Sequence, residues 1–172
     1  YEIKKIKNNN ILLFNSKETN NFEEYYQICR KESLNVSKER FVSLYQSINY
    51  IYKNDIKGDF VECGVFMGGS AMMISFASKE FEKIDIPIKN LWLYDTFEGM
   101  ANPTIYDENI LNEKAINELK NKKKKENLKD IWAYSSIDYV KQNITKTHIK
   151  PERVKYIKGL VEETLIKNKP KK

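Results

Sequence analysis

The sequence predicts an α/β fold in which a parallel β-sheet is packed between helices. Short, mostly apolar segments at 60–65, 91–95 and 154–159 alternate with stretches of helical periodicity, which is the order expected of parallel strands joined by helices. Glycines follow the first of these segments, and an acidic residue closes the second. Because ligands of open parallel sheets bind at the carboxyl ends of the strands, we expect a binding site there.

The composition is that of one folded domain rather than a disordered or membrane-spanning chain. The 172 residues are 41% hydrophobic and 31% charged, and they include 11 Tyr and 8 Phe, whereas disordered chains are usually poor in aromatic residues. The net charge is +6, but the lysines are spread along the chain, so we expect no nucleic-acid partner. No apolar run reaches the ~20 residues that cross a bilayer, so we expect no membrane contact.

The N-terminal residues and the cysteines indicate the compartment. Residues 1–10 are rich in Lys and Asn and lack the apolar core of a secretory signal. The two cysteines, Cys29 and Cys63, are too few for a disulfide framework or a zinc site. We therefore expect a cytoplasmic protein.

A polar tail and a helical segment are expected before the first strand. Residues 1–21 form the tail, with one short strand at 11–14. Residues 22–57 form the helical segment, whose second helix runs over 38–53 with Ser37 as its N-cap. The apolar face of that helix comprises Phe41, Leu44, Tyr45, Ile48 and Tyr52. Tyrosines of this segment could form a contact in a homo-oligomer.

The first two strands and the helix between them form one βαβ unit at the start of the expected binding domain, 58–172. The run 60–65 is typical of a buried strand, with Cys63 as a small buried hydrophobic residue. Apolar residues from Ala71 to Phe81 then recur at helical spacing, and 91–95 is a second buried strand.

A long polar insertion follows the second strand. Residues 100–130 contain Pro103 and four consecutive lysines at 122–125, which we expect to form a solvated face. Helical structure is expected from about 109 to 127. Because insertions of this length are often lids, the segment could fold over the substrates and exclude water; its polar composition equally fits a disordered insertion.

A helix, a strand and a second helix are predicted after the insertion. Ser136 is expected to cap the first helix, whose apolar face comprises Ile137, Val140 and Ile144. Pro151 breaks the chain before the third strand, and the next helix begins within 160–165. His148, the only histidine, precedes the third strand, at the end of the sheet opposite the expected site. We therefore expect it at the surface.

The turn 62–70 is the first candidate for ligand binding. Gly68 and Gly69 would let a ligand approach the backbone, and a helix starting at Gly69 or Ser70 would direct free N–H groups at a carboxylate or phosphate. Glu62, at the end of the strand, could accept a hydrogen bond from an ammonium group. A ligand that carries both ammonium and carboxylate matches this turn; the alternative is a tight strand-to-helix turn without a ligand.

Residues at the other strand ends extend the site. Asp95 could accept hydrogen bonds from both ribose hydroxyls, or it could cap a helix that begins near Thr96. Leu160 and Val161 could pack on an adenine face or in the core, and Ser136 either caps its helix or contacts adenine. Together these residues describe a nucleoside with an amino-acid tail. The absence of a G-x-G-x-x-G motif argues against a dinucleotide.

The strand-end motifs resemble the macrocin O-methyltransferase family, also called TylF/MycF-type enzymes, over roughly residues 35–166. The matching segments, in the same order, are Gly58–Val65, Gly68–Ser70, Trp92–Met100, Ser136–Val140 and Lys158–Leu165. The resemblance implies a Rossmann-like class I methyltransferase fold, S-adenosylmethionine as donor, Mg²⁺, and methylation of a hydroxyl of a sugar or other small molecule. The donor site that it implies comprises Phe66, Met67, Gly68, Gly69, Ser70, Asp95, Thr96, Phe97, Glu98, Gly99, Ser136, Leu160 and Val161. We add Glu62 because it could accept a hydrogen bond from the ammonium group of the donor.

This sequence departs from the family pattern in two ways. The family commonly has Trp-Arg before the glycine pair, where this chain has Phe66-Met67, so a cationic contact is lost. The family's metal ligands are aspartates at the ends of a fourth and a fifth strand, which we expect beyond Lys172, so no metal ligand or catalytic residue is assigned. We expect the fold to be truncated after the third strand, with the first strand as an exposed edge.

Two other classes of function stay open at this stage. The chain could be a non-catalytic nucleotide-binding or assembly module, or an RNA-binding protein that uses the lysine-rich insertion. No pairing of a nucleophile with a base is apparent, which argues against a hydrolase.

Overall fold

The computed structural model describes residues 21–33, 36–82, 88–117 and 133–170, and it confirms the α/β fold. A parallel sheet of three strands has the order β1-β2-β3. The strands are β1 (Phe60–Cys63), β2 (Leu91–Asp95) and β3 (Val154–Lys158). The prediction for β2 is confirmed to the residue, whereas β1 and β3 end earlier than the sequence indicated because the chain turns at Gly64 and Gly159.

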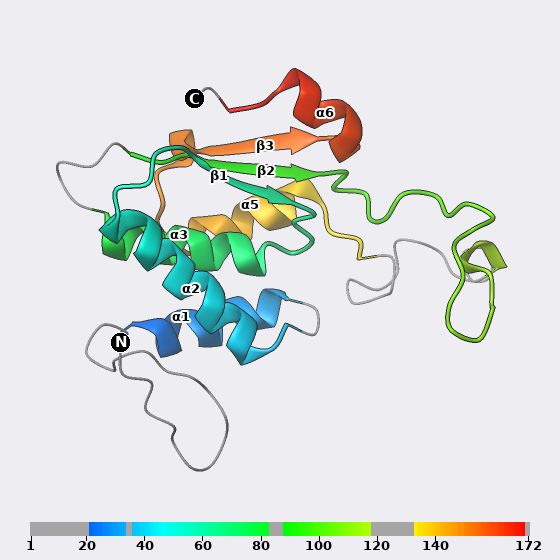
Figure 1. Cartoon of the computed structure of the whole chain (residues 1–172), viewed down its shortest axis with the longest axis horizontal. Helices are drawn as coiled ribbons and strands as arrows, with labels where there is room; N and C mark the ends of the chain where they lie inside the picture. The colour runs from blue at the N-terminus through cyan, green and yellow to red at the C-terminus, as the bar shows by residue number, and fades with distance from the viewer. Residues whose placement is uncertain (1–20, 34–35, 83–87, 118–132, 171–172) are drawn as a thin grey trace, which may run out of the picture.

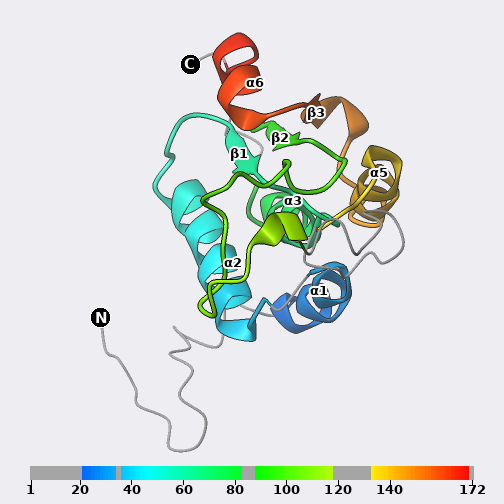
Figure 2. The ribbon, with the colours of Figure 1, turned by 90° about the vertical axis from the view of Figure 1, so that its right-hand side faces the viewer.

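Helices lie on both faces of the sheet (Figures 1 and 2). The helical elements are α1 (Phe22–Cys29), η1 (Arg30–Glu32), α2 (Lys38–Lys53), α3 (Gly69–Phe81), α5 (Ile137–Thr145), η2 (Pro151–Arg153) and α6 (Val161–Lys167). Helices α3 and α5 cover one face, with α1 and α2 beyond them, and α6 lies over the other face. None of the described helices has the length and apolar content needed to span a membrane.

The core lies between the sheet and the helices on the α3 side. Helix α3 is buried over most of its length, from Ala71 to Ser78. The predicted apolar face of α2 is confirmed: its aromatic and isoleucine side chains are buried, and Leu44 is half-buried. The ring of Tyr25 in α1 stacks on Phe76 at 4.5 Å between centroids. The N-terminal helices therefore share one core with the βαβ unit.

Strand β1 is more exposed than a buried parallel strand would be. It pairs only with β2 among the described strands, and the side chain of Val61 is 45% exposed. The expected burial of Cys63 is wrong, because this residue lies on the same face as Val61 and is exposed. Cys29 is buried instead, and both thiols are free. The predicted edge position of the strand is confirmed within the described sheet.

Polar contacts fix the amino ends of the strands, away from their carboxyl ends. The buried Arg153 guanidinium donates to the backbone oxygen of Lys89 at 2.7 Å and to Glu82 at 3.0 Å. The Asp59 carboxylate accepts hydrogen bonds from Asn90 and from the Trp92 indole. His148 is exposed, as predicted.

The insertion after β2 is only partly helical where it is described. Over 109–114 the predicted helix is wrong: Glu108 and Lys114 form an antiparallel bridge around a turn. The Asn109 side chain accepts the backbone N–H groups of Leu111 and Glu113, and such local bonds compete with helix formation. Helical structure begins only at 115–117. Residues 1–20 of the predicted tail, including the strand at 11–14, and the lysines at 122–125 lie outside the described residues.

Substituting Gly69 tests the packing at the start of α3. A Cβ atom at this position would lie 1.8 Å from Ser33 Oγ and 2.7 Å from the backbone oxygen of Glu32. We expect Gly69→Ala to lower the free energy of unfolding by about 2–3 kcal/mol, because α3 and η1 must separate. Ser70→Ala is the matched control and should change it by less than about 0.5 kcal/mol. Urea denaturation of both variants measures the difference, and equal stabilities would contradict this packing.

Candidate functional site

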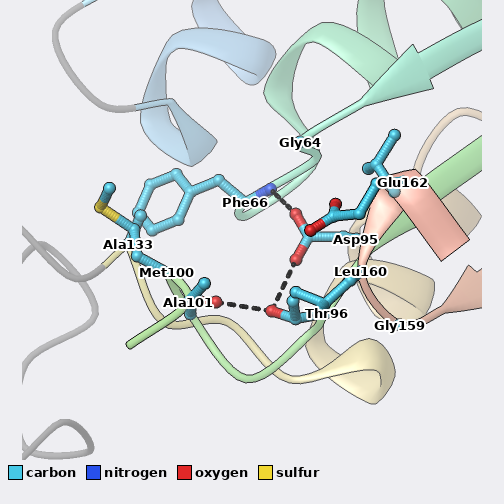
Figure 3. A pocket seen from close by; sticks show the side chains of 12 residues that line it. Gly64, Phe66, Asp95, Thr96, Met100, Ala101, Ala133, Gly159, Leu160 and Glu162 are labelled. Atoms are coloured by element: carbon cyan, nitrogen blue, oxygen red, sulfur yellow. Dashed lines mark hydrogen bonds between the residues drawn. The ribbon is translucent and has the colours of Figure 1, made fainter. Parts of the chain in front are cut away.

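A pocket of about 340 Å³ opens where the three strands end. Its volume is within the range of small-molecule sites. The lining residues are Gly64, Phe66, Asp95, Thr96, Gly99, Met100, Ala101, Ala133, Gly159, Leu160, Val161 and Glu162. Asp95 is the last residue of β2, and the others follow β1, β2 or β3 or lie at or just beyond the ends of the insertion (Figure 3). A pocket therefore lies at the carboxyl edge of the sheet, where the sequence predicted a binding site; ligand binding there stays a prediction.

The Asp95 carboxylate organises the turn after β1. Its Oδ2 atom accepts the backbone N–H groups of Val65 at 2.6 Å and Phe66 at 3.1 Å. Its Oδ1 atom accepts the N–H of Phe97 at 2.8 Å. Phe66 has φ 52°, in the left-handed region, and successive N–H groups of such a turn form a concave anion site. The anion in this concavity is the protein's own aspartate (Figure 3).

Backbone hydrogen bonds join the three strand ends at the same place. The N–H of Gly64 donates to the Tyr94 oxygen at 2.8 Å, and the N–H of Gly159 donates to the Asp95 oxygen at 3.0 Å. The Thr96 hydroxyl donates to the Gly99 oxygen at 2.5 Å. No described helix begins at Thr96, so the predicted N-cap role of Asp95 is wrong. Its contact with ribose stays a prediction.

Only one glycine of the turn meets open space. A Cβ atom at Gly64 would have no neighbour within 4 Å, and this residue lines the pocket. A Cβ at Gly68 would lie 3.3 Å from Val140, and one at Gly69 would collide with Ser33. The glycine pair thus permits close packing of α3 against α5 and η1, and neither glycine lines the pocket.

Glu62 carries an unsatisfied carboxyl oxygen. Its Oε2 atom is buried and has no hydrogen-bond partner among the described residues. Burial, and then the nearby charge of Asp95, raise the pKa of Glu62 to about 8. Glu62 does not line the pocket, but it precedes Gly64 by two residues. A buried acceptor without a partner is suited to a water or a ligand cation.

The predicted donor-site residues divide into two groups. Six of them line the pocket, namely Phe66, Asp95, Thr96, Gly99, Leu160 and Val161. The others lie outside its lining, namely Glu62, Met67, Gly68, Gly69, Ser70, Phe97, Glu98 and Ser136.

Several residues of the second group have a structural partner instead. Ser136 caps α5, accepting the N–H of Tyr139 at 3.2 Å, as one of its two predicted roles required. Phe97 is buried, and Glu98 pairs with Lys158 at 2.6 Å. Met67 is 4% exposed. At the position where the resemblance led us to expect an arginine, this chain therefore has a buried methionine.

The pocket also contains residues that the sequence argument did not assign to the site. Gly64 and Gly159 belong to the strand-end motifs, so attention to every glycine there would have found them. Glu162 directly follows Leu160-Val161. Ala101 lies at the start of the insertion and Ala133 three residues after its end, and no residue pattern marks either of them. In the part of the chain that the structure describes, no group of three or more His, Cys, Asp or Glu residues could hold a metal.

Comparisons with known proteins show the family of the chain and its fold. The sequence model of the macrocin-O-methyltransferase (TylF) family matches residues 28–172. The solved structure of the O-methyltransferase NovP is similar, with 20% identity and a TM-score of 0.57, over 76% of this chain and 49% of that one. The calicheamicin methyltransferase CalS11 has 15% identity and a TM-score of 0.46, over 91% of this chain and 63% of that one. No curated protein sequence matches. The chain spans about half the length of NovP, and the likeness to that structure supports the fold alone.

An Asp95→Asn variant tests the role of the carboxylate in the turn. Asparagine has one acceptor oxygen instead of two, so at least one of the three backbone N–H groups loses its partner. We expect the free energy of unfolding to fall by about 1–3 kcal/mol. Hydrogen exchange at Val65, Phe66 or Phe97 should accelerate. Asp138→Asn, on the exposed surface of α5, is the control. Unchanged hydrogen exchange in the Asp95 variant would show that the turn is stable without the carboxylate.

The raised pKa of Glu62 predicts a pH dependence of stability. Because the folded protein holds this proton up to a pKa of about 8 and the unfolded chain releases it near its ordinary value, stability should fall as pH rises through that interval. The slope attributable to Glu62 is at most about 1.4 kcal/mol per pH unit. Denaturation of the wild type and of Glu62→Gln from pH 5 to 8 isolates it, since the variant should lack this component. Parallel curves for the two proteins would rule it out.

Proposed function

The chain belongs to the macrocin O-methyltransferase (TylF) family, and from that premise we propose that the protein transfers a methyl group from S-adenosylmethionine to a hydroxyl of a sugar or other small molecule. The observation that carries the proposal is the pocket at the strand ends, bounded by the turn that Asp95 organises.

The chemistry of the pocket fits the proposed donor. Leu160, Val161 and Met100 provide apolar surface for a base, and Thr96 and Glu162 provide polar groups. The open space at Gly64 lets a ligand approach the backbone. The buried, unpartnered oxygen of Glu62 is suited to a cation such as an ammonium group. Few polar groups among apolar walls are typical of a site that binds and orients a small molecule.

The described residues would act by positioning. When bound, S-adenosylmethionine supplies an electrophilic methyl group. The turn of residues 64–68 is held by Asp95, so the pocket is formed before the donor enters. Such preorganisation lowers the entropic barrier to bringing two reactants together. No described residue is assigned as the base that removes the hydroxyl proton.

The requirement for Mg²⁺ is the part of the proposal that rests on the family resemblance alone. The described residues contain no cluster that fits a metal, so no step is routed through one. Loss of methyl transfer in EDTA, with recovery on adding Mg²⁺, would support this part of the proposal.

We further propose the predicted domain division, with residues 22–57 as a helical segment and 58–172 as the donor-binding part. Met100 and Ala101, at the start of the insertion 100–130, line the pocket together with Ala133, which follows its end by three residues; this placement supports the role of the insertion as a lid. A cytoplasmic location and a homo-oligomeric state stay predictions.

Two leucines of similar exposure provide a matched test of donor binding. Leu160 is 36% exposed and lines the pocket, whereas Leu165 is 38% exposed and lies further along α6, outside the lining. We expect Leu160→Ala to weaken binding of S-adenosylhomocysteine about three- to tenfold, through lost apolar contact. Leu165→Ala should leave affinity unchanged. Isothermal titration calorimetry measures the affinity of both variants, each made in the full-length protein that the gene encodes.

Ligand binding and methyl transfer by the wild-type protein test the proposal as a whole. If it fails to bind S-adenosylhomocysteine, the donor assignment is wrong. If it binds S-adenosylhomocysteine but transfers no methyl group to any hydroxylated acceptor, the data would favour a non-catalytic nucleotide-binding module.

A further inference from the structure

Three buried polar atoms near the amino end of the sheet have no hydrogen-bond partner among the described residues. They are the hydroxyl of Tyr52, the Oγ atom of Ser78 and the Oε1 atom of Glu82. Tyr52 and Ser78 are each 1% exposed, and the Tyr52 ring lies against Phe60, the first residue of β1. Because an unpaired buried polar group keeps the full cost of its desolvation, such groups are rare in folded proteins.

Contacts of Arg153 and Lys89 place these three atoms in one cluster. The Arg153 guanidinium donates to Glu82 Oε2 at 3.0 Å and to the backbone oxygen of Lys89 at 2.7 Å. The Lys89 ammonium lies 5.9 Å from the centroid of the Tyr52 ring. Ser78 lies in the last turn of α3, and its backbone oxygen accepts the N–H of Glu82, the C-cap of that helix, at 2.9 Å. Burial raises the pKa of Tyr52, and the neighbouring Ser78 and Arg153 oppose that rise.

The hydrogen-bonding groups of this cluster are complementary to a water molecule. Arg153 uses three of its five N–H groups in bonds to Lys89 and Glu82, so two N–H groups have no acceptor among the described residues. The ionised carboxylate of Glu82 only accepts, whereas the hydroxyls of Tyr52 and Ser78 both donate and accept. Water can accept from the guanidinium and donate to the carboxylate, and buried waters make about three such bonds. The charge of Arg153 disfavours a cation here, and that of Glu82 disfavours an anion.

We propose that a water molecule is bound in this cluster, where it joins Tyr52 of α2 and Ser78 of α3 to the ion pair of Glu82 and Arg153. Arg153 ends η2 and directly precedes β3. The water therefore completes the polar contacts that tie α2 and α3 to the start of β3. This inference does not depend on the proposed function, because the pocket lies at the other end of the strands.

A high-resolution crystal structure of the full-length protein that the gene encodes tests the proposal directly. We expect one ordered water within hydrogen-bond distance of Glu82 Oε1 and of at least two of the other three groups, which belong to Tyr52, Ser78 and Arg153. Direct hydrogen bonds among these side chains in place of the water would overturn the proposal. A different protein atom at the same place, or no electron density there, would overturn it as well.

Two double variants test the same water in solution. Tyr52→Phe combined with Ser78→Ala removes both hydroxyls of the cluster. Tyr50→Phe combined with Ser75→Ala is the matched control in the same two helices, because Tyr50 is 62% exposed and the Ser75 hydroxyl already donates to the Ala71 oxygen at 2.8 Å. Magnetic relaxation dispersion of water counts the long-lived buried waters of a protein. We expect the first variant to lose the signal of one such water, because two of its partners are gone, and the control to lose none.

The count of long-lived waters separates the outcomes. Equal counts in the wild type and in the variant without the two cluster hydroxyls would overturn the proposal, and so would the same loss in the control. Circular dichroism establishes that each variant is folded. If the first double variant does not fold, Ser78→Ala against Ser75→Ala provides the same comparison with one hydroxyl removed from each protein.

Discussion

The carboxylate of Asp95, at the end of the central strand, accepts backbone N–H groups from the turn after β1 and from the residue that begins the next loop. Hydrogen bonds to an ionised group are roughly twice as strong as neutral ones, so this single side chain stabilises a turn in which Phe66 has a left-handed backbone. The backbone oxygen of the same residue accepts the N–H of Gly159. One residue thus positions the ends of all three strands, and the pocket exists because those ends stay together.

The two carboxyl groups beneath this edge have opposite environments. Asp95 is surrounded by donors, whereas Glu62 has a buried oxygen with no partner in the described structure. Burial of Glu62, and then the negative charge of Asp95, favour the protonated form of Glu62 and raise its pKa to about 8. Asp95 thus accepts hydrogen bonds from backbone N–H groups, whereas the buried oxygen of Glu62 has no partner among the described residues. A cationic ligand close to the turn would lower the pKa of Glu62 and favour its ionised form.

Packing of the helices serves the same edge of the sheet. Gly69 permits close contact of α3 with η1, and Gly68 permits its approach to α5. These contacts bring the start of α3 against the end of β1, because only a few residues separate the two elements. Substitutions at the glycine pair would therefore disturb the site through the position of α3, even though neither glycine lines the pocket.

The sequence by itself determined the elements and the edge at which they form a site. Helical periodicity predicted α2, and a short apolar run that ends on an acid predicted β2, both to the residue, because these patterns depend on neighbours within a few positions. Tertiary structure decided how each residue is used. It turned Asp95 inward to the turn, exposed Cys63 at the sheet edge, and left Gly64 rather than Gly69 beside open space. It also brought Ala133 and Glu162 to one pocket. These outcomes depend on atoms distant in the chain, and no local pattern encodes which of them will meet.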